Sequence, residues 1–148
     1  MVNFSMIERI THAGYELALI IRRSFTKDGI EFFTPSAYSQ QLAYMKRPKD
    51  YSIAPHVHNP VSREVYYTKE VLFIRSGRVR VDFYTEKQEY LHSRTLEAGD
   101  VILLSGGGHG FQMLEEAEII EVKQGPYAGE QDKTTFEGIS VEQIRVVA

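Results

Sequence analysis

The chain has 148 residues, of which 43% are hydrophobic and 25% charged, and its formal net charge is -3. This length is typical of one domain with a substantial core, so we expect a single domain over residues 1–148. The slight acidity argues against nucleic acid or an acidic membrane as a partner. The chain contains no cysteine, which excludes disulfides and thiolate metal sites.

The first part of the chain also bears on location. Residues 1–8 lack a basic region followed by a long apolar run, so we expect no signal peptide. The apolar run at residues 17–21 is too short to span a bilayer. These features favour a cytoplasmic protein that does not act at a membrane.

Short segments rich in β-branched and aromatic residues, separated by turn residues, predict an all-β fold. The first predicted strands cover residues 16–23, 30–34, 38–46 and 51–58. Residues 70–75 and 78–84 predict a hairpin that turns at Ser76 and Gly77. Strands follow at 90–96 and 101–104, and residues 110–114 and 117–123 predict a last hairpin. Only residues 1–12 and 141–147 are expected to be helical.

Three histidines and one carboxylate point to a metal site. On a strand, His56 and His58 would face the same side, because side chains alternate with period two. Glu70 would project inward beside apolar neighbours, where a carboxylate must be paired or bound to metal. His109 follows three glycines, which allow a close backbone approach. We expect these four residues to hold one divalent ion, with zinc, iron, nickel and manganese all open.

The order of these residues resembles the cupins, which are small double-stranded β-helix (jelly-roll) barrels. Their first motif, G-x5-H-x-H-x3,4-E-x6-G, is matched by H-x-H at 56–58 and by E-x6-G at 70–77. In their second motif, G-x5-P-x-G-x2-H-x3-N, Gly99 matches the start and His109 the histidine. The resemblance implies a single cupin domain with its core at about 38–127. Added N-terminal strands at 15–34 and a C-terminal tail at 128–148 would complete it.

The match departs from the family pattern at several positions. Asp50 stands at the first glycine, Ser105 near the proline and Met113 at the asparagine, and the second motif is one residue short. Eleven residues separate the H-x-H from Glu70, which implies an inserted loop at 59–69. Glu64 in that loop lies nearer the family spacing and competes with Glu70 as the ligand. The spacing of Glu70 to the motif glycine favours Glu70.

A second resemblance concerns residues 124–132, which read Gln-Gly-Pro-Tyr-Ala-Gly-Glu-Gln-Asp. The segment is similar to the one that closes the cupin domain of mannose-6-phosphate isomerase/guanylyltransferase proteins. It implies chemistry on a sugar phosphate or nucleotide sugar, as in carbohydrate metabolism or polysaccharide biosynthesis.

Further residues are candidates for ligand binding and proton transfer. Arg63 in the inserted loop could hold a phosphate or carboxylate group in a bidentate manner. Gln41, Tyr44 and Gln112 are further candidates for the substrate pocket. Tyr84 and Glu64 are candidate proton carriers in a reaction.

We therefore expect a metal-binding cupin that binds or acts on a small anionic or sugar-derived ligand. Among enzyme functions, an isomerase or epimerase is favoured over an iron-dependent dioxygenase. A metal-free epimerase and a non-catalytic ligand-binding or sensing protein also stay open, so the sequence does not decide whether the protein is an enzyme. An apolar strip formed by outward-facing Val71 and Phe73 predicts a homodimer.

Overall fold

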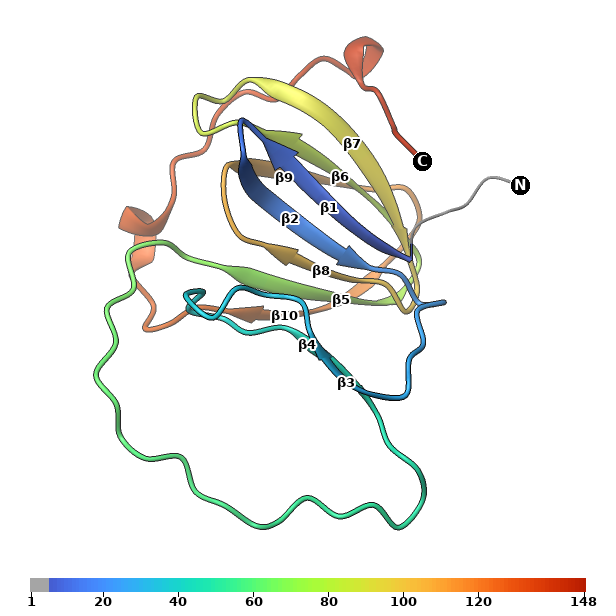
Figure 1. Cartoon of the computed structure of the whole chain (residues 1–148). Helices are drawn as coiled ribbons and strands as arrows, with labels where there is room; N and C mark the ends of the chain where they lie inside the picture. Colours follow the sequence, from blue (N-terminus) through green and yellow to red (C-terminus); the bar gives the residue numbers. More distant parts are fainter. Residues whose placement is uncertain (1–5) are drawn as a thin grey trace. The chain divides into compact units, whose positions relative to one another are not determined.

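The computed structural model describes residues 6–148, and the chain divides into two compact units. The larger unit contains the chain up to Phe25 and from Thr68 to Ala148, and the smaller unit is Thr26–Tyr67. In the smaller unit, β3 (Gly29–Phe32) pairs with β4 (Ala43–Lys46) in a two-stranded antiparallel sheet. A long segment without helix or strand follows β4 and runs to Lys69 (Figure 1).

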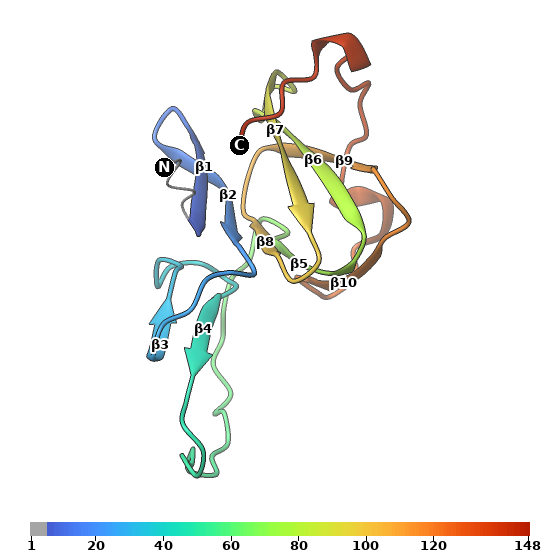
Figure 2. The same ribbon diagram turned by 90° about the vertical axis from the view of Figure 1, so that its right-hand side faces the viewer.

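The larger unit is built from two antiparallel sheets (Figures 1 and 2). One has five strands in the order β1 (Ile7–His12), β2 (Tyr15–Ile21), β8 (Val101–Leu104), β5 (Glu70–Ser76) and β10 (Glu118–Lys123). The other has three strands in the order β7 (Tyr90–Glu97), β6 (Arg78–Tyr84) and β9 (Gly108–Met113). Two short 3-10 turns, Gly129–Asp132 and Val141–Gln143, lie in the segment after β10.

Apolar side chains from both sheets form one buried cluster. It contains Ile10, Leu17, Ala18, Ile20, Leu72, Ile74, Ile102 and Leu104 of the five-stranded sheet, and Val79, Val81, Phe83 and Leu96 of the three-stranded sheet. The inner faces of the two sheets therefore pack against each other, which removes this apolar surface from water. The all-β prediction is confirmed, and neither sheet closes on itself within residues 6–148.

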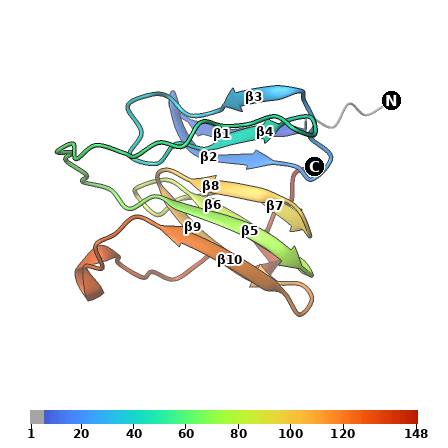
Figure 3. The same ribbon diagram turned by 90° about the horizontal axis from the view of Figure 1, so that it is seen from below.

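Two predicted hairpins are wrong in their pairing. β5 and β6 follow each other in the chain but belong to different sheets, and the same holds for β9 and β10. Each tight turn therefore carries the chain from one sheet to the other. As a result β5 pairs with β10, and Figure 3 shows these two strands side by side. The two crossings meet at Gly77, whose φ is +83° and where a Cβ would lie 2.2 Å from the carbonyl oxygen of Glu116. Only glycine fits this position.

Other element predictions are corrected as well. Residues 51–58 form no strand, and the strand predicted at 38–46 is reduced to β4. Residues 7–12 were expected to be helical but form β1, which pairs with β2, while residues 1–5 lie outside the described residues. The helix predicted at 141–147 is a single 3-10 turn. The remaining strands lie where the sequence predicts them, to within two residues at each end.

The C-terminal segment covers the outer face of the three-stranded sheet. Val146 forms a parallel bridge with Ser93 on β7, and the phenol oxygen of Tyr84 accepts the backbone N–H of Ile139. The ring of Phe136 packs edge-on against Tyr84. This cover explains why Tyr84 is buried although it points away from the core between the sheets.

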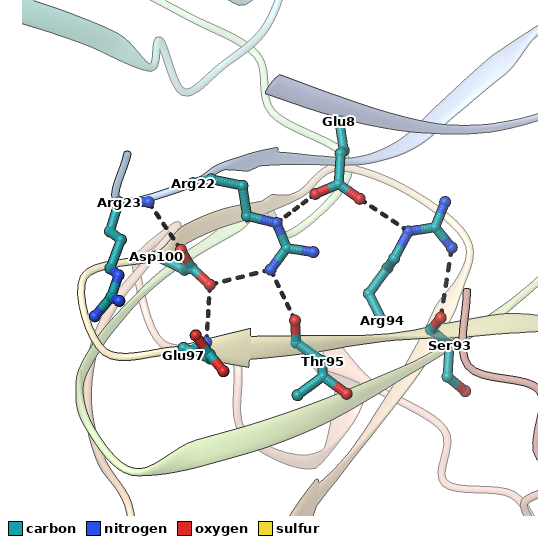
Figure 4. Close-up of polar contacts among 8 residues, drawn as sticks. All are labelled: Glu8, Arg22, Arg23, Ser93, Arg94, Thr95, Glu97 and Asp100. Carbon is teal, nitrogen blue, oxygen red and sulfur yellow. Dashed lines mark hydrogen bonds and ion pairs between the residues drawn. The ribbon is translucent and has the colours of Figure 1, made fainter. Parts of the chain in front are cut away.

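A polar network joins the two sheets of the larger unit at one edge (Figure 4). Glu8 on β1 accepts hydrogen bonds from Arg22, which follows β2, and from Arg94 on β7. Arg22 also donates to Asp100 at 3.0 Å and to the carbonyl oxygen of Thr95. Charged groups taken out of water need such partners, and here each acid faces an arginine.

No helix in the described part of the chain has the length and hydropathy needed to cross a bilayer.

Candidate metal site

Glu70 and His109 face each other across the two sheets of the larger unit. Glu70 opens β5 in the five-stranded sheet, and His109 is the second residue of β9 in the three-stranded sheet. The carboxylate oxygen Oε2 and the imidazole Nε2 lie 3.4 Å apart. The structure thus brings together the carboxylate of the first predicted motif and the histidine of the second.

The separation of these two atoms is suited to a shared metal ion. A hydrogen bond to a carboxylate is normally shorter than about 3.2 Å. Two ligand atoms that each lie about 2.1 Å from a tetrahedral ion are separated by about 3.4 Å. The Glu70 and His109 side chains are only 14% and 28% exposed, so their donor atoms are partly shielded from water. The two atoms thus form an ion-pair contact whose length also matches the separation of two zinc ligands, and the metal itself stays a prediction.

The environment of Glu70 keeps its carboxylate ionised. Its strand neighbour on the same face, Leu72, and its cross-strand partner, Leu104, are both buried. His109 lowers the pKa of Glu70 most strongly, and Lys123 lowers it further, while burial acts in the opposite direction. Lys123 Nζ lies 3.3 Å from Glu70 Oε1. An ionised carboxylate is the form that binds a metal.

The strand register turns His109 toward Glu70. His109 pairs directly with Phe83 on β6, and residues directly opposite each other share a face of the sheet. Phe83 is buried in the core, so His109 also points inward. Gly107 precedes this strand with a φ of +64°, and a Cβ there would lie 2.5 Å from the carbonyl oxygen of Tyr84. The glycine-rich turn therefore lets β9 approach β6 closely, as the sequence predicts.

His56 and His58 lie together in the smaller unit. Their ring centroids are 5.3 Å apart, with the rings nearly perpendicular. His56 Nδ1 is 2.8 Å from the carbonyl oxygen of Ala54. Because a carbonyl only accepts, Nδ1 carries the hydrogen and Nε2 keeps its lone pair. Metal-binding histidines usually show this arrangement, in which the second ring nitrogen donates to an oxygen.

The four predicted ligands stand as two pairs, one in each compact unit. Within residues 6–148, no three or more His, Asp or Glu side chains form a group that could hold a metal ion. That both pairs bind the same metal ion is therefore a prediction, which rests on the order of the four residues in the sequence.

Tyr84, a predicted proton carrier, has a structural position. It lies next to Phe83 on β6 and points to the opposite face of the sheet, because successive side chains alternate. Its hydroxyl accepts from Ile139, and its ring contacts Phe136 and Tyr90. The geometry gives a catalytic role of Tyr84 no support, and this role stays a prediction.

The other predicted ligand-binding residues are placed as follows. Gln41 accepts from the Thr34 hydroxyl and donates to two carbonyl oxygens in the turn before β4, so it shapes that turn. Arg63 and Glu64 are exposed in the segment without regular structure, where Glu64 accepts from the Tyr66 hydroxyl at 3.2 Å. The remaining two are Tyr44 on β4 and Gln112, which is exposed on β9. Their roles in binding stay predictions.

Lys123 is a site residue that the sequence analysis missed. It lies directly opposite Glu70 in the β5–β10 pairing, which brings its ammonium group to the carboxylate. The sequence offers no signal for this contact, because the predicted hairpin pairs the strand of Lys123 with β9 rather than with β5. Glu70 is thus shared between His109 and Lys123.

No family model, curated protein or solved structure matches this chain. The resemblance to the cupins therefore rests on the motif residues alone.

Proposed function

We propose that the protein is a cupin that binds one divalent metal ion and acts on a small anionic or sugar-derived ligand beside it. The observation that carries this proposal is the 3.4 Å separation of Glu70 Oε2 and His109 Nε2 across the two sheets. These are the residues that the two cupin motifs assign as ligands, and they come from strands 39 positions apart in the chain.

The remaining ligands in this proposal are His56 and His58. The tautomer of His56 leaves Nε2 free to donate to a metal. Two imidazoles, one further imidazole and one carboxylate form a donor set suited to zinc, iron, nickel or manganese. Such an ion would polarise an oxygen atom of the ligand and stabilise negative charge that develops on it.

Isomerisation or epimerisation of a sugar phosphate or nucleotide sugar is the reaction that we favour. Its support is the resemblance of residues 124–132 to a segment of mannose-6-phosphate isomerase/guanylyltransferase proteins. An isomerase that works through an enediol moves a proton next to a carbonyl group, and a divalent ion held by these residues would make that proton more acidic. Glu64 is the proposed proton carrier, because Tyr84 points to the opposite face of its sheet from Phe83.

The experiment is a ligand screen on metal-loaded protein, followed by a test for proton exchange. Sugar phosphates, nucleotide sugars and small hydroxy or keto acids are compared by their effect on the melting temperature. A ligand at one hundred times its Kd adds about 2.7 kcal/mol to the free energy of unfolding. Any ligand that stabilises the protein is then incubated in deuterium oxide, and NMR detects exchange of its carbon-bound hydrogen.

An isomerase will incorporate deuterium into the ligand, and Glu64→Gln will slow this exchange while metal binding is kept. Arg63→Ala will reduce the thermal shift if this guanidinium holds the anionic group. Stabilisation by hydrophobic compounds alone, or oxygen consumption with ferrous iron, would contradict the isomerase proposal. A stabilising ligand that never exchanges hydrogen would instead identify a binding protein.

A further inference from the structure

The outer face of the five-stranded sheet is apolar across four of its strands. The strand register places Leu19, Leu103, Val71 and Val122 side by side in one row. These residues alternate with core residues along their strands, so they point away from the other sheet. Leu19 and Leu103 are fully buried, whereas Val122 is 59% exposed. The outer face is therefore covered over β2 and β8 and open over β5 and β10.

The open part of this face is an apolar strip with an acidic border. The strip consists of Val71 and Phe73 on β5 and of Val122 and Ile120 opposite them on β10. Within residues 6–148, no further strand pairs with the free edge of β10. Residues 115–123, which form β10 and the turn before it, contain four glutamates and one lysine. An exposed apolar patch with a charged border is typical of a surface that binds another protein.

The same chain has a second uncovered apolar surface, in residues 59–67. Every residue of this segment is exposed, and none belongs to a helix or strand. Val61 and Val65 lie within it, and Tyr67 at its end is 72% exposed. Within residues 6–148 of one chain, both the apolar strip and this segment thus stay exposed to water.

The 59–67 segment has one polar side and one apolar side. The Tyr66 hydroxyl donates to the Glu64 carboxylate at 3.2 Å, so these two even-numbered side chains share a side. In extended backbone the odd-numbered residues Val61, Arg63 and Val65 lie on the other side. That side is apolar apart from one positive charge, and this charge complements the acidic border of the strip.

We propose that residues 59–67 of one copy of the chain pack over the apolar strip of a second copy, which returns the same contact. A two-fold axis makes this exchange reciprocal, so one interface covers both surfaces on both chains. Nine extended residues span up to about 30 Å, which is enough to cross the two strands of the strip. The inference adds the 59–67 segment to the predicted dimer, and it does not involve a metal ion.

The apolar area that this exchange would bury is sufficient for a stable dimer. An aromatic side chain buries about 150–250 Å² and an aliphatic one about half as much. At the exposed fractions of the residues named above, the strip and the segment together offer roughly 500 Å² per copy. A two-fold dimer covers about 1,000 Å² in total, which is the size that a specific interface needs.

Disulfide formation between two different chains tests the contact, because the native chain has no cysteine. Val65→Cys and Val122→Cys chains with different affinity tags are expressed together and oxidised. We expect a disulfide-linked species of twice the chain mass that contains both tags. Val65→Cys expressed with Lys87→Cys is the matched control, since Lys87 lies in the exposed turn after β6. It should give at least about tenfold less of this species, because a disulfide needs its two Cα atoms within about 7 Å.

A second measurement compares the two sides of the segment. Val65→Asp should raise the Kd of the dimer by at least about tenfold, because it places a carboxylate against an apolar surface. Ser62→Asp introduces the same side chain on the polar side and should keep the Kd of the wild type. Sedimentation velocity measures both values. Both positions are exposed, and circular dichroism checks that each variant keeps its fold.

Three results would overturn the inference. An intramolecular disulfide in monomers of a Val65→Cys, Val122→Cys double variant would show that the segment covers the strip of its own chain. Equal Kd values for Val65→Asp and Ser62→Asp would show that the segment takes no part in the dimer. A wild type that stays monomeric at high concentration would leave no second copy to cover the strip. None of these measurements depends on metal binding, so their outcome is separate from that of the proposed function.

Discussion

Glu70 and His109 lie on neighbouring ends of strands in opposite sheets, with Oε2 and Nε2 3.4 Å apart. Lys123 approaches the other oxygen of the same carboxylate at 3.3 Å. This carboxylate, which is only 14% exposed and has two basic partners, is the proposed metal ligand.

Glu70→Gln should weaken zinc binding by at least about tenfold, because a neutral amide is a poor zinc ligand in place of a carboxylate. Glu64→Gln is the matched control, since Glu64 is exposed and accepts a hydrogen bond from the Tyr66 hydroxyl. Competition with a chromophoric chelator measures both affinities. A large loss with Glu64→Gln and none with Glu70→Gln would move the carboxylate ligand into the 59–69 segment.

The inward direction of Glu70 and the close backbone approach before His109 could be predicted from the sequence, because each depends on residues nearby in the chain. The apolar alternation of Leu72 and Ile74 sets the face on which Glu70 lies, and both side chains are buried. The glycines before His109 predict a close backbone approach, and at Gly107 a Cβ would lie 2.5 Å from the carbonyl oxygen of Tyr84. Neither inference requires knowledge of which strands are neighbours, and both hold in the structure.

The pairing of strands could not be predicted in the same way. Turn residues such as Gly77 show where the chain reverses, but not whether the next strand returns to the same sheet. The contact of Gly77 with the backbone at Glu116 is long-range and leaves no local pattern. The contact of Lys123 with Glu70 depends on that topology and was missed for this reason.

The strand predicted at 51–58 is wrong for a different reason. Its composition resembles a strand, yet the structure gives it no strand partner among residues 6–148. A strand needs a neighbour for its backbone hydrogen bonds, and alternation of side chains does not supply one. The nearness of His56 and His58 survives, because residues two apart in extended backbone point the same way.

Asp100→Ala should lower the free energy of unfolding by roughly 3 kcal/mol, because it leaves a partly buried arginine without one of its acids. The buried Asp100 carboxylate accepts from Arg22 at 3.0 Å, and from the backbone N–H groups of Arg23 and Glu97 at 2.8 Å. Urea unfolding with an unchanged m-value measures the difference.

The control for this change is Asp28→Ala, which removes an exposed ion pair with Lys46. The Asp28 side chain is 93% exposed, so the change should stay within about 0.5 kcal/mol. Equal effects of the two substitutions would show that the network in Figure 4 contributes little to stability.

His92 should make the stability depend on pH below neutrality. Burial lowers the pKa of His92, and the positive charges of Arg94 and Arg145 lower it further. Its Nδ1 accepts from Arg94 at 2.9 Å, which requires the neutral ring. The unfolded chain therefore takes up the proton at higher pH than the folded chain. The contribution to stability is complete above about pH 6.5 and decreases as the pH falls toward the folded pKa.

His92→Gln should flatten the fall in stability between about pH 6.5 and pH 5, since glutamine does not titrate. Unfolding curves at several pH values measure this slope. His12→Gln, at the exposed end of β1, is the control and should leave it unchanged. A slope that is the same in His92→Gln and in the wild type would contradict the prediction.

Phe73→Glu should convert a dimer into monomers. The outer face of β5 and β10 carries an apolar strip formed by Val71, Phe73, Ile120 and Val122, which the strand register places side by side. Phe73 is 40% exposed, as the sequence predicts for an outward position of β5, and Val122 on β10 is 59% exposed. An apolar strip of this kind favours a protein interface, and a charge in its centre opposes one.

Light scattering coupled to size-exclusion chromatography measures the mass of the wild type and the variant. Lys87→Glu introduces a glutamate in the turn after β6, away from the strip, and should leave the mass unchanged although it changes the net charge by two units. A wild type that is monomeric at high concentration would remove the homodimer proposal.

The most direct test of the central claim is the metal content of the purified protein after loading with zinc, nickel, manganese or ferrous iron and removal of the excess. Elemental analysis should find about one ion per chain for at least one of these metals. His109→Ala should lose the ion, as should a variant with both His56→Ala and His58→Ala. Wild-type protein that retains none of the four metals would contradict the account.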